Sequence, residues 1–137
     1  MREVKRMESE DKRNFAGELG GLKDPMSQCE YLMELGLGTA EEPSIRTDQW
    51  KIGGCKTAIW IRSCIRNGNV KFVWDSDSLL VRGVLAIMED MYNGRSLGYV
   101  RTHPPEFLRE ISDDVIYPEI KENGVLKSYL KIAAFET

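Results

Sequence analysis

The chain has 137 residues, of which 42% are hydrophobic and 30% charged, and its formal net charge is −3. These values fit one globular domain with a single core, and no apolar run approaches the roughly 20 residues of a membrane span. Acidic and basic residues are interspersed, which argues against the basic face of a nucleic-acid-binding protein. Residues 1–10 lack the apolar middle of a secretory signal, so we expect a cytoplasmic protein that binds neither membrane nor nucleic acid.

The first part of the chain is predicted to be an extension followed by a helix. Residues 1–21 are charge-rich and end in two glycines, so we expect an N-terminal extension to a single domain over 22–137. The segment 24–38 begins with Asp-Pro, which suits a helix start, and ends in glycines, which suit a helix end. Helical spacing of its apolar residues predicts that Cys29 lies on the buried face.

The middle of the chain has the alternating pattern of strands. We predict strands near 57–66 and 69–74, joined by an Asn-Gly turn whose residues both accept a positive φ. A short third strand is expected near 50–53. Alternation along the first of these strands places Cys64 on the same face as Arg62, where its side chain is partly exposed.

Helices are predicted to follow the strands. The sequence 75–78 offers several N-caps, and a wide apolar stripe from Leu80 to Met91 is typical of a helix that covers a sheet. Gly94 fits its C-terminal end. A short helix is expected after Pro104-Pro105 and a final helix over 125–135. The element order predicts an α+β domain with helices against a small three-stranded antiparallel sheet.

The three cysteines do not form an obvious framework. An odd number of cysteines in a protein expected in the cytoplasm argues against disulfides, and no C-x-x-C pair indicates a zinc or thioredoxin-like site. The only histidine, His103, has no motif around it, so a Cys–His hydrolase has the weakest support.

Gly53-Gly54-Cys55 is the most informative sequence. The glycines permit unusual backbone angles and close approach of another molecule, on a turn that would present the cysteine. The nearby lysines Lys51 and Lys56 would favour the thiolate, which is the form that attacks a second sulfur. The alternative is a tight turn with a small buried thiol, because free cysteine is often buried.

Three motifs follow one another along the chain. The first, residues 52–60, Ile-Gly-Gly-Cys-Lys-Thr-Ala-Ile-Trp, resembles the cysteine loop of the SufE family of sulfur acceptors. The Asp-Ser-Asp of 75–77, followed by the Val-Arg-Gly of 81–83, resembles its second signature. The Tyr-Leu-Met-Glu-Leu-Gly of 31–36 resembles the end of its first long helix. The match in order and spacing covers roughly residues 24–95.

The resemblance implies a function and a fold. A family member accepts sulfur as a persulfide from a pyridoxal-phosphate cysteine desulfurase of the SufS kind, stimulates that enzyme and supplies sulfur for iron–sulfur cluster assembly; the matching residue in this chain is Cys55. The implied partners are the desulfurase and a downstream iron–sulfur scaffold. The implied fold is that of NifU-type scaffolds. No cofactor is expected on this chain, and we expect a sulfur-transfer protein and activator rather than a stand-alone enzyme.

The sequence departs from the family pattern at several positions. Trp50 stands where the family often has asparagine, and Trp74 where it often has glycine. Near the C-terminus Lys121 replaces an arginine, with one residue inserted. Because lysine does not reproduce a bidentate arginine contact, the role of that arginine is in doubt in this chain.

Several residues around the cysteine loop have two interpretations. Asp75 and Asp77 are either helix caps or part of a turn that packs beside the Cys55 loop and controls its exposure. Arg82 either lies near the thiol or is a solvated helix residue. Gly83 is expected to permit close packing of helix on sheet.

The alternative function is a scaffold for an iron–sulfur cluster or metal ion, held by Cys29, Cys55 and Cys64. Such a site needs thiolates that converge on one point. The predicted burial of Cys29 and the separation of the other two cysteines make this alternative weaker than sulfur transfer.

Overall fold

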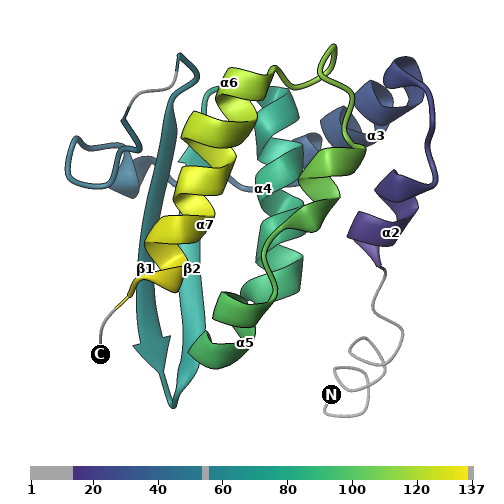
Figure 1. Cartoon of the computed structure of the whole chain (residues 1–137). Coiled ribbons are helices and arrows are strands. Elements are labelled where there is room, and N and C mark those ends of the chain that lie inside the picture. Colours follow the sequence, from purple (N-terminus) through teal and green to yellow (C-terminus); the bar gives the residue numbers. More distant parts are fainter. Residues whose placement is uncertain (1–13, 54–55, 136–137) are drawn as a thin grey trace, which may run out of the picture.

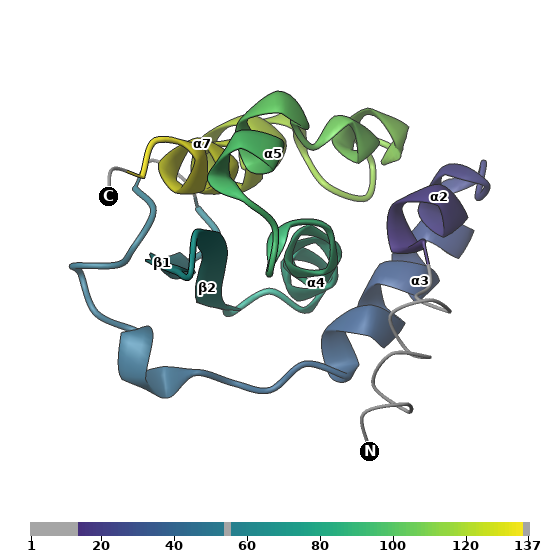
Figure 2. The same ribbon diagram turned by 90° about the horizontal axis from the view of Figure 1, so that it is seen from below.

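The computed structural model describes residues 14–53 and 56–135 and shows an α+β domain. A long antiparallel hairpin is packed by its apolar face against helices (Figure 1). Seen from below, the hairpin, α4 and α3 lie in a row, and α5 and α7 lie on one side of that row (Figure 2). The predicted α+β class is confirmed.

Helices precede and follow the hairpin along the chain. The helices are α2 (Phe15–Gly20), α3 (Pro25–Leu37), α4 (Leu79–Tyr92), α5 (Leu97–Thr102), α6 (Pro118–Ile120) and α7 (Leu126–Ala133). The strands are β1 (Ile59–Arg66) and β2 (Asn69–Ser76). Short 3-10 turns span Pro43–Ile45 and Glu106–Glu110, and a π turn spans Lys121–Val125.

The sheet in the described residues has two strands, not three. Asn67 and Gly68 have φ of 53° and 80°, as the predicted turn requires. The expected third strand near 50–53 is reduced to one isolated bridge between Lys51 and Trp60. This segment shares two backbone hydrogen bonds with β1, from Ile52 N to Ile59 O and from Ile61 N to Trp50 O. The chain then leaves the sheet at Gly53, which is too early for a ladder to form.

Helix α3 does not bury the cysteine that was predicted to lie on its buried face. Asp24 caps its first turn by accepting a hydrogen bond from Ser27 N at 2.9 Å, as expected. Cys29, however, is only half-buried, whereas Gln28 is buried. The Gln28 side chain accepts from Ser112 N at 2.8 Å and donates to Leu22 O at 3.0 Å. A fully bonded amide is tolerated in the interior, so Gln28 shares the buried side of the helix with Leu32 and Gly36.

Helices α3 and α4 pack at very close range through two glycines. A Cβ on Gly83 would collide with the backbone of Leu32 in α3, and a Cβ on Gly36 would collide with the carbonyl of Leu79 in α4. Gly83 therefore permits the close approach of two helices, rather than the approach of helix to sheet that was predicted.

The C-terminal part contains more helix than predicted. Helix α5, capped by Ser96 through Tyr99 N at 3.1 Å, was not predicted because its six residues are too few to show a periodicity. The final helical region begins at Pro118, earlier than the predicted 125, and passes through the π turn into α7.

The N-terminal segment contributes to the core of the domain. Within the predicted extension, residues 15–20 form α2, and Leu19 is fully buried in the core; the domain boundary at residue 21 stays a prediction. No helix in the described part of the chain is long and apolar enough to cross a membrane.

Candidate functional site

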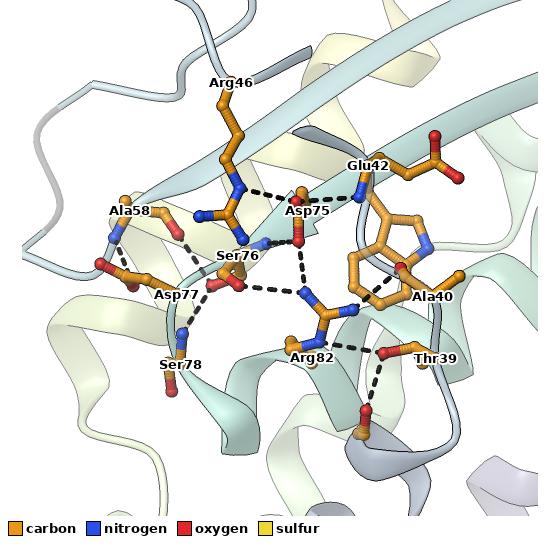
Figure 3. A network of polar contacts seen from close by, with 12 residues as sticks. Thr39, Ala40, Glu42, Arg46, Ala58, Asp75, Ser76, Asp77, Ser78 and Arg82 are labelled. Atoms are coloured by element: carbon orange, nitrogen blue, oxygen red, sulfur yellow. Dashed lines mark hydrogen bonds and ion pairs between the residues drawn. The ribbon is translucent and has the colours of Figure 1, made fainter. Parts of the chain in front are cut away.

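The cysteine loop leaves and rejoins the fold at fixed points. On the side before the cysteine, Ile52 is buried and its N–H donates to Ile59 O at 2.8 Å. On the far side, the Ala58 N–H donates to Asp77 Oδ1 at 3.1 Å, and Ala58 O accepts from Ser76 Oγ at 2.7 Å (Figure 3). The loop between these anchors is short and is held at both ends by the β1–β2 pair and the turn that follows it.

The loop residues themselves lie in open surroundings where the structure describes them. Gly53 is exposed, and no atom lies within 4 Å of a Cβ built on it. Lys56 is exposed and Thr57 half-buried. Gly54 and Cys55, the predicted supporting glycine and acceptor, lie outside the described residues.

Asp75 is the centre of a buried network behind the loop anchor. Its side chain is fully buried. Oδ2 accepts from Arg46 Nε at 2.7 Å and from the Glu42 N–H at 3.0 Å. Oδ1 accepts from the Ser76 N–H at 2.8 Å and from Arg82 Nη1. Burial by itself would raise the pKa of Asp75, but these hydrogen bonds outweigh it and hold the pKa below its ordinary value.

Arg82 joins this network to the loop that follows α3. It is 8% exposed, so the interpretation as a solvated helix residue is wrong. Its Nε donates to Thr39 Oγ1 at 2.9 Å and its Nη2 to Ala40 O at 2.9 Å, while Nη1 also reaches Ser76 O at 3.1 Å (Figure 3). Because each of its three nitrogens donates a hydrogen bond, the guanidinium fixes the path of residues 39–42 beside the end of β2.

Neither predicted aspartate caps α4. The N-cap is Ser78, whose side chain accepts from the Val81 N–H at 3.3 Å. Asp77 instead accepts from the Ala58 backbone, which ties the turn 75–78 to the end of the cysteine loop. The packing of this turn beside the loop is therefore present, whereas its control of Cys55 exposure stays a prediction.

The structure brings Asp75 and Arg82 into direct contact and adds partners that sequence reasoning missed. Arg46 and Thr39 come from the loop before the hairpin and carried no motif. Ser76 belongs to the Asp-Ser-Asp motif, but the motif predicted only a cap and not its hydrogen bond to Ala58 O. A hollow of ≈460 Å³ opens over the network.

The three tryptophans of the hairpin and of the segment before it differ in burial. Trp74 is buried in the core, and Trp50 and Trp60 are half-buried. The guanidinium of Arg46 lies 5.0 Å from the ring centroid of Trp60, and that of Arg62 lies 5.9 Å from that of Trp50. A guanidinium therefore lies over each of the two half-buried rings.

Lys121, the lysine that was compared with the family arginine, makes structural contacts. Its Nζ donates to Ile111 O and to Asp113 Oδ1, the latter at 2.8 Å. It stabilises the turn before α6, a contact that one ammonium group satisfies.

The cysteines of the alternative scaffold do not gather in the described structure. Cys29 is on α3 and Cys64 is exposed on β1, with α4 between these elements (Figure 2). No group of three or more potential metal-binding side chains occurs among residues 14–53 and 56–135. Cys55 lies outside those ranges, so the three-cysteine site is not tested directly.

A family model and a curated relative of this chain name the same family. The sequence profile of the SufE family, described as an Fe-S metabolism associated domain, matches residues 13–133. The chain is 26% identical over 107 residues to SufE-like protein 1, chloroplastic/mitochondrial, of Arabidopsis thaliana; the match spans 77% of this chain and 29% of that protein. The solution structure of a hypothetical protein from Thermus thermophilus superposes with a TM-score of 0.66 at 16% identity, over 86% of this chain and 87% of that one. That likeness shows the shared fold.

Proposed function

The chain belongs to the SufE family of Fe–S metabolism associated domains, and from this premise we propose that Cys55 accepts sulfur from a cysteine desulfurase. We further propose that the protein stimulates the desulfurase and passes the sulfur on for iron–sulfur cluster assembly. The observation that carries the proposal is the family match over 13–133, a range that contains the Gly-Gly-Cys sequence, which resembles the cysteine loop of the family.

The geometry around the loop supports this assignment. A sulfur acceptor has to present one thiol to a partner protein while the rest of the domain keeps its shape. The anchors at Ile52 and Ala58 hold the two ends of the loop. The exposed Gly53 carries no side chain that would obstruct a partner.

The transfer step is a thiol exchange on sulfur. The Cys55 thiolate attacks the terminal sulfur of a persulfide on the desulfurase. A new S–S bond forms on Cys55 as the old S–S bond breaks, and the desulfurase cysteine leaves as a thiolate. No net oxidation occurs, because the sulfane sulfur only changes its carrier. Nearby cations, Lys51 and Lys56, favour the attacking thiolate.

A cluster or metal scaffold is the second interpretation of the three cysteines, and no observation favours it. The placement of Cys29 and Cys64 on elements separated by α4 would require Cys55 to meet both at once.

The proposal is tested by the turnover of a cysteine desulfurase from the same organism. Alanine release from cysteine is measured with wild-type protein and with Cys55→Ser, with Cys64→Ser and Cys29→Ser as matched controls. We expect wild type and both controls to raise the rate, and Cys55→Ser to leave it at the level of the desulfurase alone. Equal stimulation by Cys55→Ser would contradict a role for this thiol in turnover.

A further inference from the structure

The outer face of the hairpin carries a row of cations around Cys64. Arg62 and Arg66 lie on either side of Cys64 along β1, and Lys71 of β2 is its direct partner across the strands. Directly paired residues in an antiparallel sheet share a face. All four side chains are exposed, so three positive charges surround one accessible thiol.

The row continues toward the cysteine loop. Lys51 is exposed and forms the isolated bridge with Trp60, which places it on the same face of the hairpin. It lies four residues before Cys55. The strip formed by Lys51, Arg62, Arg66 and Lys71, named the cation strip below, thus runs from the hairpin turn to the start of the loop.

The charges of the cation strip are not neutralised by the part of the chain that the structure describes. Within that part, none of its four members forms an ion pair, whereas Arg46 and Arg82 are bound to Asp75. The guanidinium of Arg62 lies over the ring of Trp50, which leaves its charge in place. Such cations on a protein with a net charge of −3 mark a local field of opposite sign to the whole molecule.

A groove of ≈530 Å³ opens beside the strip. Its lining includes the strand cations Arg62, Arg66 and Lys71, and also Glu42 and Glu89. Glu89 already accepts a hydrogen bond from an indole N–H at 2.6 Å. The three cations attract an anionic occupant and the two glutamates repel it, so we expect such an occupant to lie along the strand cations.

We propose that the cation strip docks an extended acidic segment of the desulfurase, an inference that rests on the proposed function. Alternate residues of a strand are about 7 Å apart, so the strip offers charge at the interval at which an extended chain presents every second side chain. A short acidic segment meets only the strip. A long polyanion such as nucleic acid would also meet the negative remainder of the surface, so a protein segment is the better match.

The test uses Cys64 as a reporter in the full-length Cys55→Ser protein. Alkylation by N-ethylmaleimide is followed by peptide mapping at low salt, with an alternating glutamate–threonine peptide, acetylated and amidated, as the probe. We expect the peptide to slow alkylation of Cys64 severalfold and to leave Cys29, on α3, unchanged. Added salt should abolish the protection.

Charge variants show whether the strip is responsible. Arg66→Gln/Lys71→Gln should raise the peptide concentration needed for half-protection about fivefold, since each exposed charge pair contributes modestly. Arg109→Gln/Lys127→Gln removes the same charge from exposed positions on other elements and should change nothing. Arg62 is left intact because it also packs on Trp50.

Several outcomes would overturn the docking proposal. One is equal protection by an uncharged control peptide in which glutamine replaces each glutamate. The others are equal protection by inorganic phosphate at matched charge and an equal loss in the control variant. Sulfur transfer that needs no more desulfurase in Arg66→Gln/Lys71→Gln than in wild type would also overturn it, while the proposed function stands. If the peptide protects Cys64 but the wild-type protein accepts no sulfur, the proposed function is overturned, while the cation strip remains a docking face for acidic segments.

Discussion

Asp75 is the residue at which three segments of the chain meet. Its two carboxylate oxygens hold Arg46 from the loop before the hairpin and Arg82 from α4, at the end of β2. A fully buried carboxylate is stable only with such partners. The network therefore fixes the turn 75–78, and this turn anchors Ala58 at the end of the cysteine loop.

The substitution Asp75→Asn should lower the free energy of unfolding by about 3 kcal/mol at neutral pH, since it leaves a buried guanidinium without its counter-charge. Because the folded pKa of Asp75 is lowered from 3.8, the stabilisation is present above that value. It is lost as the pH falls through the lower folded pKa. Urea unfolding at neutral pH and near pH 2 measures both limits, and the difference between the proteins should shrink in acid.

Asp113→Asn is the matched control, because its partner Lys121 is also a cation but Asp113 is largely exposed. We expect a loss below about 1 kcal/mol. An equal loss in the two variants would mean that burial of the Asp75 network contributes nothing particular.

Sequence reasoning identified Asp75, Asp77 and Arg82 but not the residues that bind them. The Asp-Ser-Asp and Val-Arg-Gly motifs are local and visible. Arg46 and Thr39 are 29 and 43 residues away from their partners, and no local pattern predicts such a pairing. Ser78 takes the capping role expected of the aspartates, because all four side chains of the turn are competent caps, while Asp77 and Ser76 both bind Ala58.

At the scale of elements, hydrophobic periodicity predicted the helices and strands that are held by apolar packing. It failed where polar contacts decide the structure. The hairpin and α4 have strong patterns and were predicted within a few residues. In α3 the bonded amide of Gln28 displaced Cys29 from the core. The third strand failed because only two backbone hydrogen bonds form before the chain turns away at Gly53.

The close packing of α3 on α4 makes Gly83 the most sensitive glycine of the described helices. Gly83→Ala should lower the free energy of unfolding by about 3 kcal/mol, since the new methyl group would displace the α3 backbone at Leu32. Gly98→Ala in α5, where the nearest atom is 4.0 Å from the new Cβ, should stay within about 0.5 kcal/mol of wild type. Equal midpoints of urea unfolding for the two variants would contradict this account of the interface.

At the scale of the whole molecule, the composition did not show that cations collect on one face of the hairpin. Interspersed acids and bases and a net charge of −3 indicated no basic face. The hairpin register nevertheless collects Arg62, Arg66 and Lys71 on one side of the sheet, since alternation sorts residues by face. The α+β class and the family followed from motif order, whereas this surface required the register.

The measurement that tests the central claim most directly is intact-protein mass spectrometry under non-reducing conditions. The protein is incubated with a cysteine desulfurase, pyridoxal phosphate and cysteine, alongside Cys55→Ser and Cys64→Ser. The account predicts a gain of sulfur, reversed by dithiothreitol, on wild type and Cys64→Ser and none on Cys55→Ser. Absence of added sulfur on wild type with a desulfurase from the same organism, or its presence on Cys55→Ser, would contradict the account.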